Sequence, residues 1–104
     1  MPKGVLVVES RPSSPDRDHE YNSWYDGIHL RELLALDGFV GARRLRPVAD
    51  DGPYVALYEL EGDDLQAIVD NMVACGQRGE LHLSDALMLD PPPAMRLLEV
   101  TTER

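Results

Sequence analysis

The segment HEYNSWYDGIHLREL, residues 19 to 33, concentrates the side chains that could carry out chemistry. It holds the only tryptophan of the chain, Trp24, together with two of the four tyrosines and two of the three histidines. Asp26 and Glu32 lie among them. A helix that only packs against a core needs the aromatic rings, but it does not need an imidazole and two carboxylates beside them. The segment is therefore a candidate functional site.

Helical geometry predicts which of these side chains share a face. With residues 21–36 on a helix at about 100° per residue, seven side chains fall within an arc of roughly 140°. They are Tyr21, Trp24, Tyr25, Ile28, His29, Glu32 and Leu36. Asp26 and Glu32 stand three positions from His29, and Tyr25 stands four positions from it, so each can reach the imidazole.

Two interpretations of this face remain open. In the first, Trp24, Tyr25 and Ile28 are core residues, His29 is a half-buried histidine whose hydrogen bonds are satisfied, and Glu32 leans to solvent. In the second, the helix and a sheet enclose a cavity in which His29 transfers protons, because histidine titrates nearest to neutral pH. One of the two carboxylates would then fix the tautomer of the imidazole and raise its basicity, and tyrosine hydroxyls would bind a substrate oxygen.

The elements around the segment alternate between strand and helix patterns. Apolar runs predict strands at residues 5–8, 39–48, 54–60 and 94–101, and caps and periodicity predict helices at 15–36 and 62–76. The order β-α-β-β-α-β is that of the ferredoxin-like α+β plait, a four-stranded antiparallel sheet with two helices on one face. Gly27 predicts a kink within the first helix. Residues 80–93 fit either a short helix or a covering loop.

The chain length predicts one domain over residues 1–104. The strands at 5–8 and 54–60 carry apolar residues on both faces, whereas two helices can cover only one face. An exposed apolar sheet face indicates a partner, and a second copy is the simplest one, so we expect a homodimer.

The composition excludes several kinds of partner. The net charge is −9, so no basic face is left for a nucleic acid or an anionic membrane. No apolar run approaches membrane-spanning length, and no signal-peptide pattern is visible, so we expect a cytoplasmic protein. Cys75, the single cysteine, fits a buried small side chain. We expect no metal and no cofactor, since no HxH or HxxxH spacing occurs; a haem would have only His29 or His82 as a proximal ligand.

Three further residues are candidates outside the first helix. Tyr54 and Tyr58 share one face of their predicted strand, and Tyr58 would join the cavity unless both simply pack on the sheet. Arg44 shares a strand face with Ala42 and would anchor a carboxylate or phenolate, or else form salt bridges with the abundant carboxylates.

Residues 21 to 46, YNSWYDGIHLRELLALDGFVGARRLR, resemble the motif FNxWYDxxHLPELLAxPGFxxARRYR of the EthD-like group in the dimeric α/β-barrel superfamily. The resemblance covers about a quarter of the chain. It implies a plait whose sheets pack together in a homodimer, a pocket in each subunit between sheet and helices, and a functional histidine at His29. Arg31 and Asp37 stand where that motif usually has proline.

Members of that superfamily include polyketide cyclases, cofactor-free monooxygenases, muconolactone isomerases, haem-degrading enzymes and dye-type peroxidases. The resemblance implies a small aromatic or apolar substrate and leaves the reaction open. We predict a cofactor-independent enzyme that acts by proton transfer on an aromatic or polyketide-like molecule. The expected catalytic residues are His29, Tyr25 and Asp26, and the expected substrate-binding residues are Tyr21, Trp24, Ile28, Glu32, Arg44 and Tyr58. The alternative is a non-catalytic dimeric module that binds a small hydrophobic ligand or serves as an accessory subunit.

Overall fold

The computed structural model describes residues 1–104 and contains a single four-stranded sheet. The strands are β1 (Lys3–Ser10), β2 (Phe39–Leu45), β3 (Tyr54–Glu61) and β4 (Ala94–Glu99). The helical segments are η1 (Pro15–Arg17), α1 (Asp18–Trp24), η2 (Tyr25–His29), α2 (Leu30–Leu34) and α3 (Leu65–Gln77). The first four helical segments follow one another directly, so the predicted β-α-β-β-α-β order and the ferredoxin-like α+β fold are confirmed.

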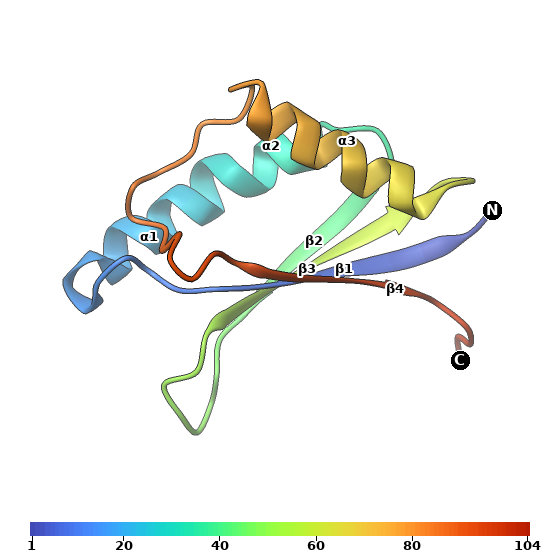
Figure 1. The fold of residues 1–104 in the computed structure, drawn as a ribbon. Helices are drawn as coiled ribbons and strands as arrows, with labels where there is room; N and C mark the ends of the chain where they lie inside the picture. The colour runs from blue at the N-terminus through green and yellow to red at the C-terminus, as the bar shows by residue number, and fades with distance from the viewer.

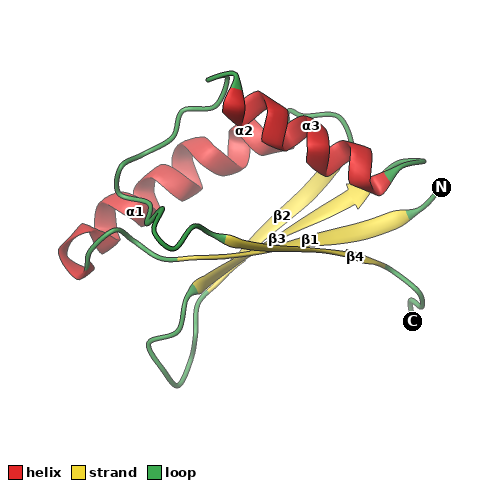
Figure 2. Cartoon of the chain, viewed as in Figure 1, coloured by secondary structure: helices red, strands yellow, loops and turns green.

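All strand pairs in the sheet are antiparallel, and the strand order is β2-β3-β1-β4. The two central strands are therefore β1 and β3, with Leu6 opposite Tyr58. The first helical run (η1 to α2) and α3 cover the same face of the sheet, and the β2–β3 connection extends away from them (Figures 1 and 2). Because side chains alternate along a strand, one set of positions faces the helices and the other set faces away.

The core lies between the sheet and the helices. Tyr21, Tyr58 and Leu6 are almost completely buried there, and they come from α1, β3 and β1. A register shift between Phe39 and Gly41 in β2 places both Phe39 and Arg44 on the helix-facing side of the sheet. This shift brings a charged side chain under the first helix.

The first helical run begins where the sequence predicts it and ends two residues earlier. Ser14 is extended and Pro15 opens η1, but the Ser14 hydroxyl donates to Asp16 Oδ1 at 2.6 Å and does not cap the backbone. The run ends at Leu34, and Gly38 with φ of 88° turns the chain into β2. None of the helices is long and apolar enough to cross a membrane.

The second helix, α3, starts with a side-chain cap. The Asp64 carboxylate accepts a hydrogen bond from the backbone N–H of Ala67 at 3.1 Å. Val69, Met72 and Cys75 form its buried stripe, so Cys75 is a buried side chain as predicted. The helix ends at Gln77, two residues before the left-handed Gly79.

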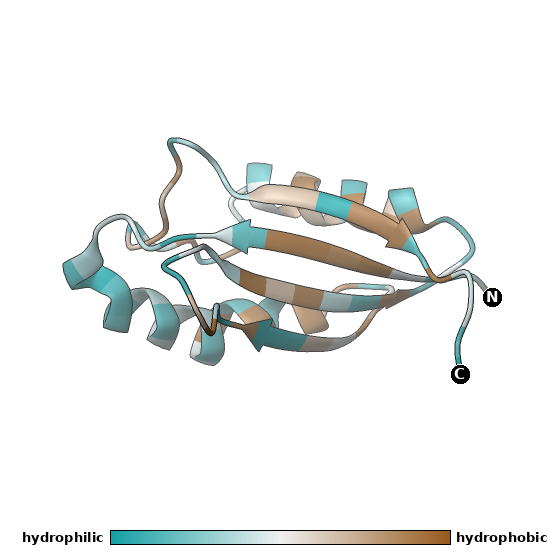
Figure 3. Ribbon diagram, turned by 90° about the horizontal axis from the view of Figure 1, so that it is seen from below, coloured by the Kyte–Doolittle hydropathy of each residue, from teal (hydrophilic) through white to brown (hydrophobic).

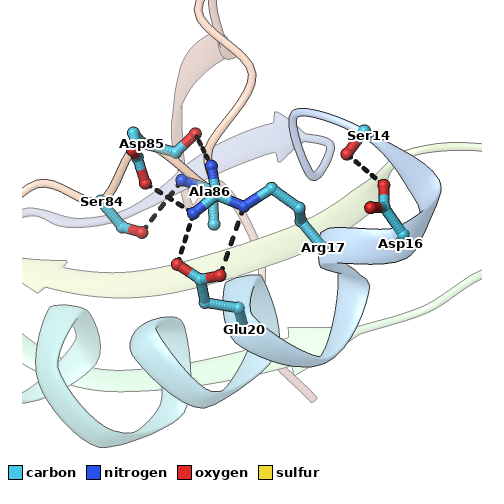
Figure 4. Close-up of polar contacts among 7 residues, drawn as sticks. All are labelled: Ser14, Asp16, Arg17, Glu20, Ser84, Asp85 and Ala86. Carbon is cyan, nitrogen blue, oxygen red and sulfur yellow. Dashed lines mark hydrogen bonds and ion pairs between the residues drawn. The ribbon is translucent and has the colours of Figure 1, made fainter.

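Residues 78–93, which we call the strap, form the covering loop that was one of two alternatives for this part of the chain. In Figure 1 the strap leaves α3, passes α1 and returns to the sheet as β4. Near the middle of the strap, Asp85 contacts Arg17, which also pairs with Glu20. The Arg17 guanidinium donates to the Asp85 carboxylate at 2.6 Å (Figure 4). The backbone N–H of Ser13 donates to Ala86 O at 2.6 Å. The strap is thus fastened to the beginning of the first helix.

The outer face of the sheet is not covered by any element of the chain. Val5, Val7 and Leu57 lie on this face, opposite in direction to the core residues, and they are only partly buried. Leu45 and Leu98 on the edge strands are 43% and 41% exposed. Figure 3 looks onto this face and shows β1 as hydrophobic over most of its length.

Candidate functional site

A cavity of about 270 Å³ lies between the first helical run, the sheet, α3 and the strap. Most of its wall is apolar. The lining side chains come from the first helical run (Trp24, Tyr25, His29, Leu33), the strands (Val8, Ser10, Tyr58, Met95), α3 (Met72, Val73) and the strap (Leu81, Leu83, Leu87, Leu89), together with Gly76, Pro92 and Pro93. We call this the His29 cavity.

A π-helical turn, η2, determines which residues face the His29 cavity. The backbone N–H of Leu30 donates to the carbonyl of Tyr25, five residues earlier, so this turn holds one more residue than an α-helical turn. The extra residue shifts every later residue of the helical run by one position around the helix axis. His29 and Leu33 consequently follow Tyr25 on the inner face, and Leu33 is only 2% exposed.

Ile28 does not belong to the cavity, so its expected place in the site was wrong. Its side chain is 45% exposed, and it does not line the cavity wall. In a regular α-helix Ile28 would point to the inner face. In the π-helical turn His29 points there, and Ile28 points outward. The kink expected at Gly27 takes the form of this turn, which contains Gly27 at its centre.

The imidazole of His29 is held by two aromatic rings. It stacks on the Trp24 indole with 4.6 Å between centroids and meets the Tyr25 ring edge to face at 4.9 Å. Its Nδ1 atom is buried and has no hydrogen-bond partner. Burial lowers the pKa of His29 to about 4, although the charge of Glu32 opposes that shift. The ring is therefore neutral at pH 7.

Neither carboxylate that was expected to orient His29 contacts it. Glu32 instead accepts two hydrogen bonds from His82, one from the backbone N–H at 2.9 Å and one at ring Nδ1 at 2.6 Å. Burial alone would raise the pKa of Glu32, but these bonds outweigh it and the pKa lies below its usual value. Glu32 thus fastens the strap and does not line the cavity, so its expected place among the substrate-binding residues was wrong. Its charge does raise the pKa of His29, as expected, although burial has the larger effect.

Asp26 forms an ion pair with Arg44, away from the His29 cavity. Arg44 Nη1 donates to Asp26 Oδ1 at 3.0 Å and to Asn22 Oδ1 at 2.8 Å. These residues line a separate polar cleft of about 410 Å³ together with Asp18, Leu45, Arg46 and Tyr54. Asp26 therefore lies outside the His29 cavity, contrary to its expected catalytic place.

Arg44 approaches the cavity behind the ring of Tyr25. Its guanidinium carbon lies 4.3 Å from the centroid of the Tyr25 ring, on which it makes a cation–π contact. The Arg44 side chain is 12% exposed, and its Nε and Nη2 atoms are buried without partners. The positive charge is thus behind one wall of the cavity and does not line it.

Hydroxyl groups gather where the first helical run meets the sheet. Ser10 Oγ lies 2.6 Å from the hydroxyl of Tyr21, and the Tyr58 hydroxyl donates to that of Tyr25 at 3.4 Å. Burial raises the pKa of all three phenols, most strongly for Tyr58. The structure brings Tyr58 to the cavity, as expected. Tyr21 contacts Ser10 and does not line the cavity, so its expected place among the substrate-binding residues was wrong.

Ser10 was missed by sequence reasoning, and the strap was predicted as a covering loop but not as part of the cavity wall. Ser10 lines the cavity because it continues the alternation of Leu6 and Val8 along β1, and that alternation was a usable signal. The strap supplies Leu81, Leu83 and other apolar wall residues, for which no periodic signal exists. Its carbonyl at His82 also accepts the Trp24 Nε1–H at 2.6 Å, which fixes the indole.

Histidine, cysteine and carboxylate side chains nowhere gather in a group of three or more that could hold a metal ion. His82 has an exposed side chain, as predicted for a loop histidine, with an exposed fraction of 84%.

Comparisons with known proteins give a result for the fold. No protein-family model matches the chain, and no curated protein matches it. Among solved structures, the haem-degrading protein MhuD of Mycobacterium tuberculosis, with two haems bound in its active site, superposes with a TM-score of 0.68 at 17% identity. The match covers 97% of this chain and 98% of that chain. An arginine-to-serine variant of MhuD with two manganese protoporphyrin IX molecules per active site matches equally, with a TM-score of 0.68. The chain shares its ferredoxin-like α+β fold with these structures.

Proposed function

We propose that this protein is a small-molecule enzyme that binds an aromatic or polyketide-like molecule in the His29 cavity and uses His29 in proton transfer. The observation that carries the proposal is the buried, unpartnered Nδ1 of a neutral imidazole in the wall of an apolar cavity. A buried nitrogen without a partner has a free-energy cost for the folded protein, and such groups are typical of functional sites.

The cavity determines the size and polarity of the proposed ligand. Its volume of about 270 Å³ lies just below the usual range for drug-sized ligands, which starts at about 300 Å³, so it suits a molecule of one or two rings. Its wall is formed by Trp24, Tyr25 and several leucines, which favours a flat apolar molecule. The reaction classes that need only proton transfer and orientation are aldol-type cyclisation, enolisation, isomerisation and the oxygenation of an electron-rich phenolate.

The resemblance of residues 21–46 to the EthD-like group supports this proposal, since it implies a pocket at the same helix. The fold shared with MhuD is compatible with it but names no reaction for this chain.

Haem, which one of the MhuD structures contains, is a poor fit to the His29 cavity. A tetrapyrrole is much larger than a molecule of two rings, and the cavity holds about 270 Å³. His29 is covered by Trp24 on one ring face, and its Nδ1 is buried. His82 keeps its Nδ1 on Glu32 and is exposed on the strap. We therefore propose a smaller ligand and derive no step through haem.

We also propose that the protein acts as a homodimer through the outer face of the sheet. The centre of this face is apolar at Val7, Leu57 and their neighbours. Arg43 and Glu59 lie on the same face, so both signs of charge are present and a second copy can complement them. A face of this kind favours self-association.

The decisive experiment compares two histidine variants of the same helical run. Purified protein is assayed by oxygen uptake and mass spectrometry against a panel of phenols and aromatic β-polyketones. We expect His29→Ala to lower turnover by at least about a hundredfold, the low end for a positioned proton-transfer group. His19→Ala, an exposed histidine at the start of α1, is the control and should leave turnover unchanged.

Full activity in His29→Ala would remove the proton-transfer mechanism. The alternative function is a non-catalytic module that binds a small hydrophobic ligand, and the same cavity would serve it. Saturable binding of panel members by the wild-type protein, without turnover of any of them, would favour that alternative.

A further inference from the structure

The polar part of the His29 cavity consists of hydroxyl groups from three different elements. Ser10 ends β1, Tyr25 begins η2 and Tyr58 lies in the middle of β3, and all three line the cavity. Tyr21 stands behind Ser10, with the two oxygens 2.6 Å apart. All four side chains are buried, so these hydroxyls depend on one another or on a ligand for their hydrogen bonds.

The hydrogen count of this cluster is not balanced. Each hydroxyl carries one hydrogen, and the cluster makes two internal hydrogen bonds, one between Ser10 and Tyr21 and one from Tyr58 to Tyr25. Each bond uses one hydrogen, which leaves two O–H groups without an acceptor inside the cluster. A buried donor without an acceptor is unfavourable, so the cluster is complementary to a ligand atom that accepts hydrogen bonds.

Arg44 adds a positive charge behind this cluster. Its guanidinium carbon lies 4.3 Å from the centroid of the Tyr25 ring and 5.3 Å from that of Tyr21. The charge opposes the effect of burial on the pKa of both phenols. A fixed cation next to hydrogen-bond donors, inside a poorly solvated cavity, stabilises negative charge on an oxygen bound by those donors.

We propose that Ser10 and Tyr25 donate to one acceptor oxygen of the ligand, while Tyr58 orients the Tyr25 hydroxyl. This oxygen is a phenol, an enol or the corresponding oxyanion on an apolar ring. The inference rests on the proposed function, because it names the ligand class of the same cavity. Arg44 is a positioning residue here: it acts through the Tyr25 ring and does not touch the ligand.

The test compares two ligands of nearly equal shape by isothermal titration calorimetry. 2-Naphthol carries the oxygen, and 2-methylnaphthalene has a methyl group in its place. We expect the wild-type protein to bind 2-naphthol about tenfold more tightly, a ratio that corresponds to one good hydrogen bond.

The variants Tyr25→Phe and Ser10→Ala remove one hydroxyl each and keep the packing. Either should reduce the preference for 2-naphthol, and the double variant should bring its affinity to within about twofold of that for 2-methylnaphthalene, because each hydroxyl supplies part of the preference. The affinity for 2-methylnaphthalene should stay unchanged, which shows that the cavity is intact. Tyr54→Phe is the control, since the Tyr54 hydroxyl donates to Asp18 at 2.7 Å and does not line the cavity.

The possible failures are distinguishable. Equal affinity of the wild-type protein for the two ligands would overturn the oxygen site and leave the proposed apolar cavity intact. A preference for 2-naphthol that survives in Tyr25→Phe, Ser10→Ala and Tyr58→Phe would also overturn it. Absence of binding for both ligands would overturn the proposed cavity and this inference together.

Discussion

At the scale of single residues, His29 determines what chemistry the cavity can support. A histidine with a pKa of about 4 is unprotonated at neutral pH, so it can accept a proton, but it is a weak base. Such a base works best on a substrate whose proton is already mobile, as in a phenol or an enol. Burial lowers the basicity of His29 and so favours phenols and enols as substrates. The hydroxyl cluster favours the same class of molecule.

The pKa of His29 also predicts how stability depends on pH. Between pH 6.5 and about 4, the unfolded chain binds a proton at this position and the folded chain does not, so acidification favours unfolding. The full contribution is present above pH 6.5 and is lost as the pH falls toward 4. It amounts to at most about 3 kcal/mol, at about 1.4 kcal/mol per pKa unit.

This prediction is checked by urea unfolding of wild type and His29→Gln at several pH values. Carboxylates titrate in both proteins, so only the difference between them reports on His29. The difference in the free energy of unfolding should change by up to about 3 kcal/mol across this range, with the variant less sensitive to acid. Parallel curves for the two proteins would show that the imidazole is not held neutral by the fold.

At the scale of elements, the π-helical turn is the feature that shapes the site. Residues 25–29 hold one residue more than an α-helical turn, with Gly27 in the middle. A hypothetical Cβ at Gly27 meets no atom within 4 Å, so the glycine is not required by packing. The π-helical turn therefore depends on how many residues lie between Tyr25 and Leu30, and not on the side chain at position 27.

Deletion of Gly27 should convert the turn into regular α-helix and keep the fold. The residues that follow keep their faces, because one residue fewer restores the α-helical spacing between Tyr25 and His29. We expect the free energy of unfolding to change by no more than about 1 kcal/mol, the helix penalty of a glycine. Affinity for 2-naphthol should stay close to that of the wild-type protein, since Tyr25 and His29 remain on the inner face.

Gly27→Ala is the matched control for that deletion. It adds helix propensity without changing the number of residues, so it should stabilise the protein by up to about 1 kcal/mol and leave affinity unchanged. Thermal unfolding and calorimetric titration measure both quantities. A deletion variant that unfolds, or that no longer binds 2-naphthol, would show that the extra residue is needed to place His29.

The strap yields a second prediction at this scale. Glu32 is its attachment to α2, through the backbone and ring of His82. Glu32→Ala should therefore raise amide hydrogen exchange in the strap around His82 with little change in the sheet. Asp70→Ala, an exposed carboxylate on α3 that accepts a hydrogen bond only from Gln66, is the control and should leave strap exchange unchanged. Unchanged exchange in Glu32→Ala would mean that other contacts hold the strap.

The elements of the fold could be predicted from the sequence, but the details of the site could not. Alternating and periodic apolar residues define the strands and α3, because burial acts on every turn of such an element. The π-helical turn has no such pattern, so Ile28 was placed inside and Leu33 was not named. Asp26 and Glu32 were assigned to His29 by spacing along the helix, whereas Arg44 and His82 reach them from other elements. The spacing of residues along one helix cannot predict a hydrogen-bond partner that comes from a distant part of the chain.

At the scale of the whole molecule, the outer face of the sheet is the main unsatisfied surface. The helices cover the other face, and Leu57 and Val7, paired on the two central strands, remain near the centre of this one. Burying such residues against a second copy is favourable at about 25 cal/mol per Å² of apolar surface. A homodimer would thus add stability that a chain of this size can use.

Leu57→Glu should disrupt this association, because it places a charge at the centre of the proposed interface. We expect the wild-type protein to be dimeric at micromolar concentration and the variant to be monomeric, as measured by light scattering after gel filtration. Leu34→Glu is the control, since Leu34 is also exposed but lies on α2, in the helical layer. A monomeric wild-type protein would refute the dimer directly.

The extra residue in the turn from Tyr25 to His29 has a consequence for tracing the ancestry of this chain. A relative that lacks the insertion would carry its histidine one position closer to the tyrosine in sequence and at the same place in space. An alignment that forbids gaps inside helices would pair that histidine with Ile28 and score the site as lost. Searches for relatives should therefore treat the spacings WYxxH and WYxxxH as one motif, with a single gap allowed between the tyrosine and the histidine.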